Sequence, residues 1–248
     1  MPETALSQTQ LPHHRLAVTA KLGALLISVD FELRAPWTVL FGPSGSGKSS
    51  LLRAMCGFEV GGPATTIQFT RMAQDGSITS MDALPSSRRD IAYAPQSPAL
   101  LPHLDAGRNV SFPFEVCSSP VRDSNIVDEA LGLFKLHALA ERRPRELSGG
   151  EAQRVNLARA FATPGAKLLL LDEPFNGIDR ATRDALLPEL LRVAATRGVP
   201  VVSVTHDVEE ALRLEAEVIR IENGQVVAQG TARTVLAEEA RRIAAVLR

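Results

Sequence analysis

The sequence has few cysteines, almost no net charge and no long apolar run, and each of these absences excludes a class of protein. Its two cysteines, Cys56 and Cys117, cannot form a disulfide framework, so we expect reduced thiols and a cytoplasmic protein. Lysine and arginine total 27 against 28 for aspartate and glutamate, and a net charge of −1 provides no basic field for nucleic acid. We therefore expect no nucleic-acid partner.

Membrane-spanning and exported classes are also disfavoured. No apolar run approaches the ~20 residues that cross a bilayer, and the first fifteen residues lack the apolar core of a signal peptide. A chain of 248 residues has room for one α/β domain with a full core, but not for a second large domain. We expect a protein that is soluble or peripheral to a membrane.

One stretch, Gly42–Ser49, has the spacing of a phosphate-binding loop: two glycines separated by four residues and followed by lysine and serine. An extended run precedes it and a helical run, 49–56, follows it. Glycines let backbone N–H groups turn toward an anion, and the following helix directs its positive end there. A flexible Gly/Ser linker is the alternative, which the flanking strand and helix disfavour. The predicted nucleotide-binding residues are Gly42, Pro43, Ser44, Gly45, Ser46, Gly47, Lys48, Ser49 and Ser50.

The two residues at the end of this loop have chemistry of their own. Lys48 would reach the β- and γ-phosphates as a point charge. The Ser49 hydroxyl would supply one ligand to a Mg²⁺ ion that keeps most of its waters. The loop therefore predicts a protein that binds a nucleoside triphosphate.

Apolar patterns along the chain predict an α/β fold. Alternating apolar residues between 16 and 41 predict strands, and the Gly/Thr/Ser-rich segment 61–80 predicts a small antiparallel hairpin layer. Unbroken apolar runs at 167–171 and 199–204 are typical of strands buried on both faces of a parallel sheet. The sequence thus predicts a parallel sheet beside an antiparallel one.

Prolines and polar residues predict where regular structure stops. Four prolines between 97 and 122 predict no long regular element there, and Pro188 predicts a kink or break in the helix around it. The polar segment 1–14 is expected to be a frayed lead-in, with His13 and His14 exposed to solvent.

A pair of glycines opens the helix that is predicted to begin at Ser148. Ser148 and Glu151 form a capping box, and helix capping alone is one explanation of the turn. Capping does not explain Gly149 and Gly150, because glycine in a helix costs about 1 kcal/mol relative to alanine. We infer that a ligand approaches this backbone closely, and the free N–H groups of a helix start favour a phosphate.

Polar residues follow several predicted strands. Gln96 follows one strand, Asp172 and Glu173 follow a second, and His206 follows a third. Ligands bind beyond the carboxyl ends of strands in open α/β sheets, so we expect these residues to gather beside the phosphate loop. Each has an ordinary alternative, since Asp172-Glu173 could be a solvated turn and His206 could belong to a helix cap. Their shared position favours a catalytic site.

In this order and at this spacing, the motifs resemble those of the ATP-binding subunit of ABC transporters over residues 16–236. The turn at Ser148 is what separates that family from other phosphate-loop proteins. The resemblance implies a P-loop NTPase core, residues 15–96 and 154–248, with a mostly parallel sheet, helices on both faces and an antiparallel β layer. It also implies an inserted helical subdomain, residues 97–153.

The resemblance implies roles for individual residues toward ATP and Mg²⁺. Asp172 would hold Mg²⁺ through its water shell, and Glu173 would polarise the attacking water. His206 would contact the γ-phosphate, and Gln96 would sense both the metal and the transporter. The predicted catalytic residues are therefore Glu173, His206, Lys48 and Gln96, and the predicted metal ligands are Ser49, Gln96 and Asp172.

The family hydrolyses nucleotide between two head-to-tail copies, so part of each site would come from a second chain. Asn176-Gly177-Ile178-Asp179 occupies the place of the dimer-crossing loop, in which Asp179 matches and the preceding residues depart from the common Ser-x-Leu pattern. The predicted contacts to the partner's ATP are Ser148, Gly149, Gly150, Glu151 and Asp179.

Two further positions depart from the family pattern. The segment 21–25 lacks the aromatic residue on which adenine usually stacks, so adenine would rest on Leu22 or nearby apolar atoms. Trp37 stands where a turn glycine is usual. Both features look more like molybdate and related oxyanion importers than lipid exporters.

The resemblance thus predicts an ATP hydrolase that powers an importer of a small solute, of the molybdate or sulfate type, on the cytoplasmic face of the inner membrane. Expected partners are a second copy or a sibling ATPase, transmembrane permease subunits and, through them, a solute-binding protein. Alternatives are an exporter subunit, a soluble ABC ATPase in DNA or ribosome work, and a phosphate-loop kinase. The kinase would leave the 148–151 turn and His206 without a purpose.

Overall fold

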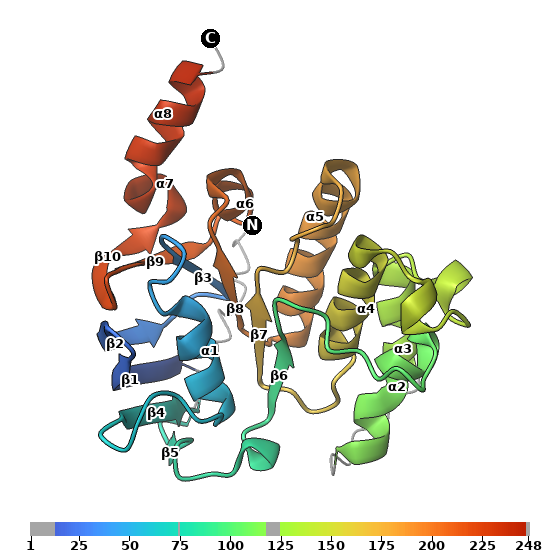
Figure 1. Cartoon of the computed structure of the whole chain (residues 1–248), viewed down its shortest axis with the longest axis horizontal. Coiled ribbons are helices and arrows are strands. Elements are labelled where there is room, and N and C mark those ends of the chain that lie inside the picture. The colour runs from blue at the N-terminus through green and yellow to red at the C-terminus, as the bar shows by residue number, and fades with distance from the viewer. Residues whose placement is uncertain (1–12, 74, 118–124, 247–248) are drawn as a thin grey trace, which may run out of the picture.

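A computed structural model describes residues 13–73, 75–117 and 125–246 of the chain. The described strands are β1 (His13–Leu22), β2 (Leu25–Leu33), β3 (Trp37–Phe41), β4 (Thr66–Met72), β5 (Ile78–Ser80), β6 (Ile91–Ala94), β7 (Leu168–Asp172), β8 (Val201–Thr205), β9 (Glu217–Glu222) and β10 (Gln225–Thr231). They form one sheet in the order β5-β4-β1-β2-β10-β9-β3-β8-β7-β6 (Figure 1). Neighbours from β9 to β6 are parallel, whereas β5, β4, β1 and β2 pair antiparallel.

Helices surround the parallel part of this sheet. The described helices are α1 (Lys48–Cys56), α2 (Ala106–Val116), α3 (Asn125–Leu133), α4 (Gly149–Phe161), α5 (Arg180–Arg197), α6 (Val208–Arg213), α7 (Ala232–Val235) and α8 (Ala237–Val246). Helices α2, α3 and α4 pack on one another beside β6, and α8 projects from the opposite end (Figure 1). No helix in the described ranges has both the length and the apolar content for a bilayer crossing.

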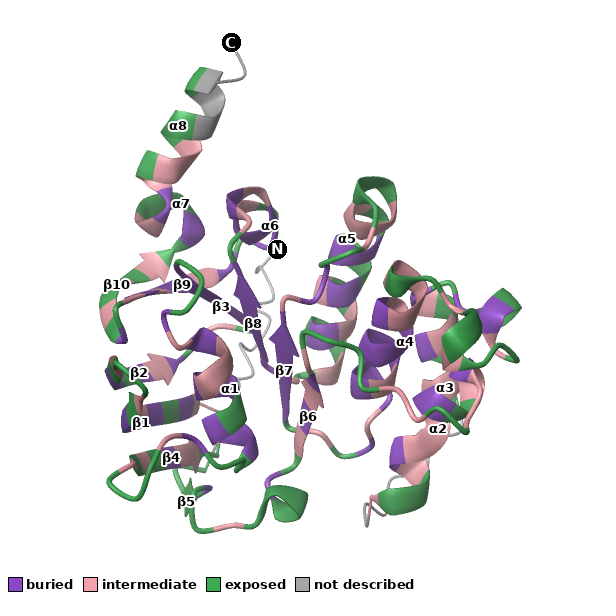
Figure 2. Ribbon diagram, in the orientation of Figure 1, coloured by how far each residue is buried: buried purple, intermediate pink, exposed green. Residues whose placement is uncertain are grey.

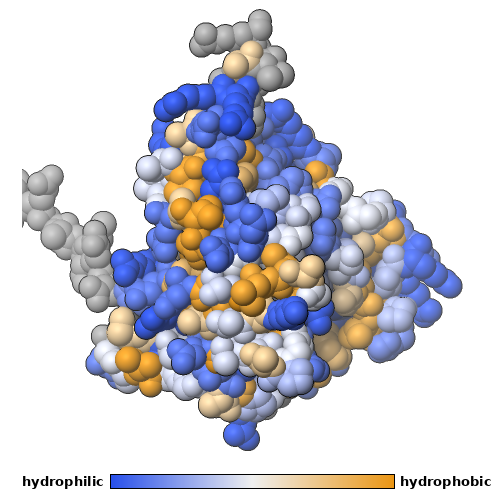
Figure 3. Space-filling view, turned by 60° about the vertical axis from the view of Figure 1, so that its left-hand side comes forward, coloured by the Kyte–Doolittle hydropathy of each residue, from blue (hydrophilic) through white to orange (hydrophobic). Residues whose placement is uncertain are grey.

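Two hydrophobic clusters lie on opposite faces of the parallel strands. Leu169 and Leu171 of β7 pack with residues of α4 and α5, whereas Leu168 and Leu170 pack with α1 and with strands β1 and β2. Both faces of β7 and β8 are therefore buried (Figure 2), which is why these runs show no apolar alternation. On the face turned forward in Figure 3, hydrophobic residues form separate patches among hydrophilic ones.

The predicted α/β class is confirmed, with helices on both faces of a mostly parallel sheet. The expected antiparallel hairpin is β4 paired with β5, and β4 also pairs with β1. The antiparallel strands are thus an extension of the same sheet, joined to the parallel part through β2 and β10. The inserted helices predicted between 97 and 153 are α2, α3 and the first turns of α4.

The expectation of no long regular element between 97 and 122 is wrong, and Pro188 does not break the helix around it. Helix α2 runs for 11 residues through Pro113, and α5 runs for 18 residues through Pro188. Pro188 lies on the exposed side of α5, where a carbonyl group that loses its helical partner can bond to water, while Leu187 and Leu190 anchor the other side in the core. Packing of the apolar face thus outweighs one missing hydrogen bond.

The expectation for His14 is also wrong. Residues 1–12 lie outside the described residues, but His13 and His14 belong to β1. His14 is only 2% exposed, and its ring stacks on Phe69 with the centroids 5.8 Å apart. It points to the same side as Leu16 because side chains alternate along a strand. Burial, followed by the nearby charges of Arg71 and His13, lowers the pKa of His14 to about 4.

Candidate functional site

The phosphate loop connects β3 to α1, as its pattern predicts. Gly47 caps α1 with φ 98°, a left-handed conformation, and a β-carbon there would lie 2.6 Å from the Cδ1 atom of Ile27. A β-carbon on Gly42 would overlap the backbone carbonyl of Ile221. Gly47 is therefore required chiefly by its left-handed backbone, and Gly42 by the close approach of the β9 backbone to the loop.

Lys48 lies inside the loop that it ends. Its ammonium donates to the carbonyl oxygens of Gly42, at 2.9 Å, and Pro43, at 2.7 Å, and lies 3.3 Å from Ser46 Oγ. Burial lowers the pKa of Lys48, and the carboxylates of Glu173 and Asp172 oppose this shift. A cation held in this way faces the centre of the loop, where an anion would bind.

Asp172, at the end of β7, is bonded to the loop. Ser49 Oγ donates to Asp172 Oδ1 at 3.0 Å, and the Tyr93 hydroxyl donates to Oδ2 at 3.5 Å. Burial raises the pKa of Asp172, while the hydrogen bond from Ser49 opposes the rise. A divalent cation at this point would favour the ionised carboxylate.

The donor set around Asp172 fits Mg²⁺. A serine hydroxyl, a carboxylate and the amide oxygen of Gln96 are hard oxygen ligands. The described residues contain no group of three or more His, Cys, Asp or Glu side chains suited to a metal ion. Mg²⁺ does not need such a group, because it keeps several waters and binds through one or two protein ligands plus phosphate.

Glu173, which follows β7, contacts residues that follow two neighbouring strands. Its Oε2 atom accepts from Gln96 Nε2 at 3.0 Å and from Asn176 Nδ2 at 3.4 Å. Its Oε1 atom lies 3.6 Å from His206 Nδ1. The backbone of Glu173 has φ 46°, a left-handed conformation that is uncommon outside glycine. The structure thus brings Gln96, Glu173 and His206 together, as the strand-end argument predicts.

A cleft of about 390 Å³ connects the loop to Glu173. Its lining combines loop residues with Gln96, Glu173 and Val204. Leu22 and Leu25, at the turn between β1 and β2, line the same cleft. An apolar surface therefore lies where the sequence predicts contact with a base, and it is made of leucine side chains.

The turn at Ser148 combines a helix cap with two different glycines. The Ser148 N–H donates to Glu151 Oε2 at 2.7 Å, and the Glu151 N–H donates to Ser148 Oγ at 3.3 Å, which completes the predicted capping box. Gly149 has open space where a β-carbon would lie, whereas a β-carbon on Gly150 would lie 2.5 Å from the Gly177 carbonyl oxygen. Sequence reasoning assigned both glycines to a ligand, but contact within the chain already explains Gly150.

Ser148 and Gly149 are exposed and do not line the cleft beside the phosphate loop. Asp179 is exposed as well, and its carboxylate caps α5 by accepting from the Thr182 N–H at 3.0 Å. Within one chain, therefore, the residues predicted to contact a partner's ATP are separate from the residues predicted to bind the chain's own ATP.

Two buried polar residues of α4 were not assigned a role from the sequence. Gln153 Nε2 donates to the carbonyl oxygen of Pro174 at 3.1 Å, and Asn156 Nδ2 donates to that of Pro95 at 2.9 Å. They hold the segments that carry Glu173 and Gln96. The available signal was their position on the otherwise apolar inner face of the helix.

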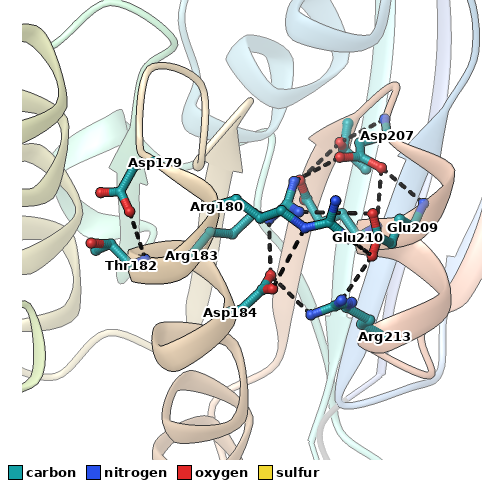
Figure 4. A network of polar contacts seen from close by, with 10 residues as sticks. Asp179, Arg180, Thr182, Arg183, Asp184, Asp207, Glu209, Glu210 and Arg213 are labelled. Atoms are coloured by element: carbon teal, nitrogen blue, oxygen red, sulfur yellow. Dashed lines mark hydrogen bonds and ion pairs between the residues drawn. The ribbon is translucent and has the colours of Figure 1, made fainter.

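A charged network joins α5 to α6 (Figure 4). Arg183 Nη1 pairs with Asp207 Oδ2 at 2.8 Å, and Arg213 Nη1 pairs with Asp184 Oδ1 at 2.9 Å. Arg180 pairs with Glu209 across the same two helices. The helix that follows Asp179 is thus tied to the helix that follows His206.

Comparison with known proteins supplies a family for this arrangement. The ABC transporter family model matches residues 27–176. The molybdate/tungstate import ATP-binding protein WtpC of Archaeoglobus fulgidus is 38% identical over 210 residues, which are 85% of this chain and 83% of that protein. The molybdenum import ATP-binding protein ModC of Rhodopseudomonas palustris is 36% identical over 227 residues, which are 90% of this chain and 58% of that protein. The chain thus spans little more than half of the second relative.

A solved structure shares the architecture. A dimeric ATP-binding cassette in a post-hydrolysis state, bound to ADP and Pi, superimposes with a TM-score of 0.74 at 27% sequence identity. The match covers 89% of this chain and 99% of that one. The similarity therefore extends over nearly the whole of that cassette.

Proposed function

The chain belongs to the ABC transporter family, and on that premise we propose that it binds and hydrolyses ATP as the energy-supplying subunit of a membrane importer. The observation that carries the proposal is Glu173, which is held by Gln96 and lies opposite His206 at the mouth of the phosphate-loop cleft. A carboxylate in this position can take a proton from a water molecule that attacks a bound phosphate.

The phosphate loop and the end of β7 would hold the nucleotide. Backbone N–H groups of residues 42–49 and the Lys48 ammonium would bind the β- and γ-phosphates. Ser49, Asp172 and Gln96 would hold Mg²⁺, which when bound neutralises charge on the phosphates. The Leu22 and Leu25 side chains would receive the adenine ring in place of an aromatic residue.

Hydrolysis would depend on positioning and charge rather than on a covalent intermediate. Glu173 would orient the attacking water and accept its proton, because its carboxylate is fixed by Gln96 and Asn176. His206 would donate a hydrogen bond to the γ-phosphate from the other side of Glu173. Lys48 would stabilise the charge that develops on the transferred phosphoryl group.

A second copy of the chain, or a sibling ATPase, would complete each site in a head-to-tail dimer. Ser148, Gly149 and Glu151 are at least partly accessible, and the free N–H groups at the start of α4 suit a phosphate from outside the chain. Asp179 is also exposed and follows Gly177, whose carbonyl group lies against the glycine turn at the start of α4. Asp179 would cross the dimer interface. The dimeric form of the similar solved cassette supports this arrangement.

The cargo would be a small oxyanion of the molybdate, tungstate or sulfate type. The names of both similar importers, which are a molybdate/tungstate and a molybdenum importer, support this class. Transmembrane permease subunits, contacted through the segment 97–122 and α2 to α4, would couple hydrolysis to transport. The chain would then lie on the cytoplasmic face of the inner membrane and act with a solute-binding protein.

Glu173→Gln tests the catalytic part of the proposal. The amide keeps the size and hydrogen bonds of the side chain but cannot accept a proton, so turnover should fall at least a hundredfold while Mg-ATP still binds. Phosphate release measures turnover, and light scattering after gel filtration should detect an ATP-bound dimer. Hydrolysis near the parent rate would remove Glu173 from the role of base, and a strictly monomeric Mg-ATP form would contradict the shared site.

The cargo requires a separate experiment with the permease and binding protein in vesicles. Molybdate, tungstate and sulfate should stimulate ATP hydrolysis, whereas spermidine should not. Stimulation by spermidine alone would contradict the oxyanion class and leave the ATPase assignment intact.

A further inference from the structure

A second, smaller cavity lies behind Glu173, away from the phosphate loop. It encloses about 160 Å³, and its lining includes Glu173, Arg183, His206, Asp207 and Glu210. Glu210 is only 4% exposed, and its Oε1 atom has no hydrogen-bond partner among the described residues. A buried carboxyl group with one free oxygen, beside the proposed base and outside the predicted catalytic set, requires an explanation.

Glu210 closes a ring of hydrogen bonds with Thr205 and Asp207, the two residues that flank His206 in the chain. The Glu210 N–H donates to Asp207 Oδ1 at 3.2 Å, and the Asp207 N–H donates to Thr205 Oγ1 at 3.1 Å. Because Thr205 Oγ1 already accepts, its own proton can go to Glu210 Oε2, 3.2 Å away. The ring joins the end of β8 to the first turn of α6, and His206 lies in the chain between two of its members.

The His206 side chain itself is weakly held. It is 68% exposed, and its polar contact with the rest of the described chain is the 3.6 Å approach of Nδ1 to Glu173 Oε1. Its direction is therefore set by the backbone of the turn and not by packing of the ring. Arg183 of α5 also holds this turn, because its Nη1 atom donates to Asp207 Oδ2 at 2.8 Å.

We propose that Glu210 is a positioning residue for ATP hydrolysis, which acts through Thr205 to fix the turn that directs His206 toward Glu173. The inference rests on the proposed function of this site. Glu210 touches neither the nucleotide nor the water in this scheme, and its effect on the reaction passes through the position of the imidazole.

The ring should respond to pH. Burial raises the pKa of Glu210 to about 8; the hydrogen bond from Thr205 opposes the rise, Asp207 and Glu173 add to it, and Arg183 opposes it. Below pH 8 the Glu210 carboxyl group is neutral and adds no charge to those of its neighbours Arg183, Asp207 and Glu173. Above pH 8 it becomes a third carboxylate, and repulsion from Asp207 should loosen the turn.

Charged groups on the other elements that pack against α6 are paired elsewhere. Helices α7 and α8 contact α6. In α7, Arg233 faces Glu215; in α8, Glu239 pairs with Arg220 and Glu238 pairs with Arg242. On α6 itself, Glu209 pairs with Arg213 and with Arg180 and Arg183 of α5, and Arg213 also pairs with Asp184 of α5. The ionisation of Glu210 is therefore opposed mainly by burial, Asp207 and Glu173.

The test compares wild type, Glu210→Ala, Glu210→Gln and the surface control Glu238→Gln in ATP hydrolysis from pH 6.5 to 9.5. Glu210→Ala removes the acceptor for Thr205, so kcat should fall at least tenfold at pH 7 with KM changed less than threefold. Glu210→Gln keeps an oxygen for Thr205 and cannot ionise, so it should retain kcat within twofold and lose the wild-type decline above pH 8. Glu238→Gln should follow wild type, because Glu238 is exposed on α8 and pairs only with Arg242 among the described residues.

Two results would overturn the proposal: an alkaline decline in Glu210→Gln equal to that of wild type, or a kcat for Glu210→Ala within twofold of wild type. A titration without nucleotide separates this failure from failure of the proposed function. The His206 imidazole NMR signal should shift with a midpoint near pH 8 in wild type and not in Glu210→Gln. A wild-type signal without that midpoint contradicts the coupling, whether or not the protein hydrolyses ATP. This measurement also serves if Glu210→Ala does not fold.

Discussion

The two glycines at the start of α4 allow packing and ligand binding to be separated by single substitutions. Gly149 has open space where a β-carbon would point, and its φ is not in the left-handed region. Gly150 is pressed against the Gly177 carbonyl group. Alanine at Gly149 would therefore add a methyl group toward solvent, and alanine at Gly150 would add one into backbone.

The structure gives opposite signs for the two changes in stability. Gly149→Ala should stabilise the chain by about 0.4–1 kcal/mol, because alanine loses less conformational freedom on folding. Gly150→Ala places a β-carbon 2.5 Å from an oxygen and should destabilise by about 1–3 kcal/mol, because neither backbone can easily move. For a chain of this size these values correspond to roughly +1 to +4 °C and −2 to −12 °C in Tm.

Activity should not follow stability. Thermal unfolding and Mg-ATP hydrolysis are measured on both variants at concentrations that favour a dimer. Gly149→Ala should be more stable than wild type and yet hydrolyse ATP at least tenfold more slowly. The added methyl group would block the approach of the phosphates of ATP bound to a second copy of the chain. Full turnover in Gly149→Ala would refute close approach of a ligand to this turn, and a lower Tm for Gly149→Ala would refute the open space.

Three further predictions concern single side chains. Arg89 is buried and donates to four backbone carbonyl groups, two of them at the end of α1. Arg89→Ala should therefore lower the free energy of unfolding, measured by denaturant titration, by about 3 kcal/mol or more. Arg88 is exposed, so Arg88→Ala should change this free energy little. His14 has a folded-state pKa of about 4, below its unfolded value near 6.5, so its neutral form stabilises the fold above pH 6.5 and that contribution is lost as pH falls toward 4. Between pH 7 and 5 the loss should be about 2 kcal/mol, and His14→Leu should remove it; an unchanged pH slope would contradict burial of the ring. Ser148→Asp should keep the helix cap and Tm but slow hydrolysis at least tenfold by repelling phosphate; undiminished hydrolysis would leave Ser148 with capping alone.

Local patterns in the sequence predicted the elements that position the site. The leucines of β7 could be interpreted from their short unbroken run, which is typical of a strand covered on both faces. The convergence of Gln96, Glu173 and His206 followed from a general property of parallel sheets, so it required no knowledge of side-chain contacts.

Contacts between distant segments could not be predicted in this way. The approach of Gly150 to Gly177 joins the first turn of α4 to the loop after β7, and no local pattern encodes it. The Arg183–Asp207 pair joins two helices whose relative position depends on the whole sheet. His14 is a different case, since extending the alternation of Leu16 and Val18 back by two residues would have placed it in the core. The polar residues that precede His14 in the sequence favoured an exposed side chain instead.

The capping box and the proposed phosphate contact at Ser148 are compatible because the backbone part of the cap does not depend on the direction of the hydroxyl proton. The cap uses the Ser148 N–H and a lone pair of its hydroxyl oxygen. The hydroxyl proton lies beside the Glu151 carboxylate and helps to lower its pKa, and rotation about the Cβ–Oγ bond would let the hydroxyl donate to an anion instead. The Glu151 carboxylate is drawn back toward the Ser148 N–H, and this bond keeps its pKa below the usual range and its charge away from the helix axis. A turn that serves one chain as a helix start can thus serve a second chain as part of its phosphate site.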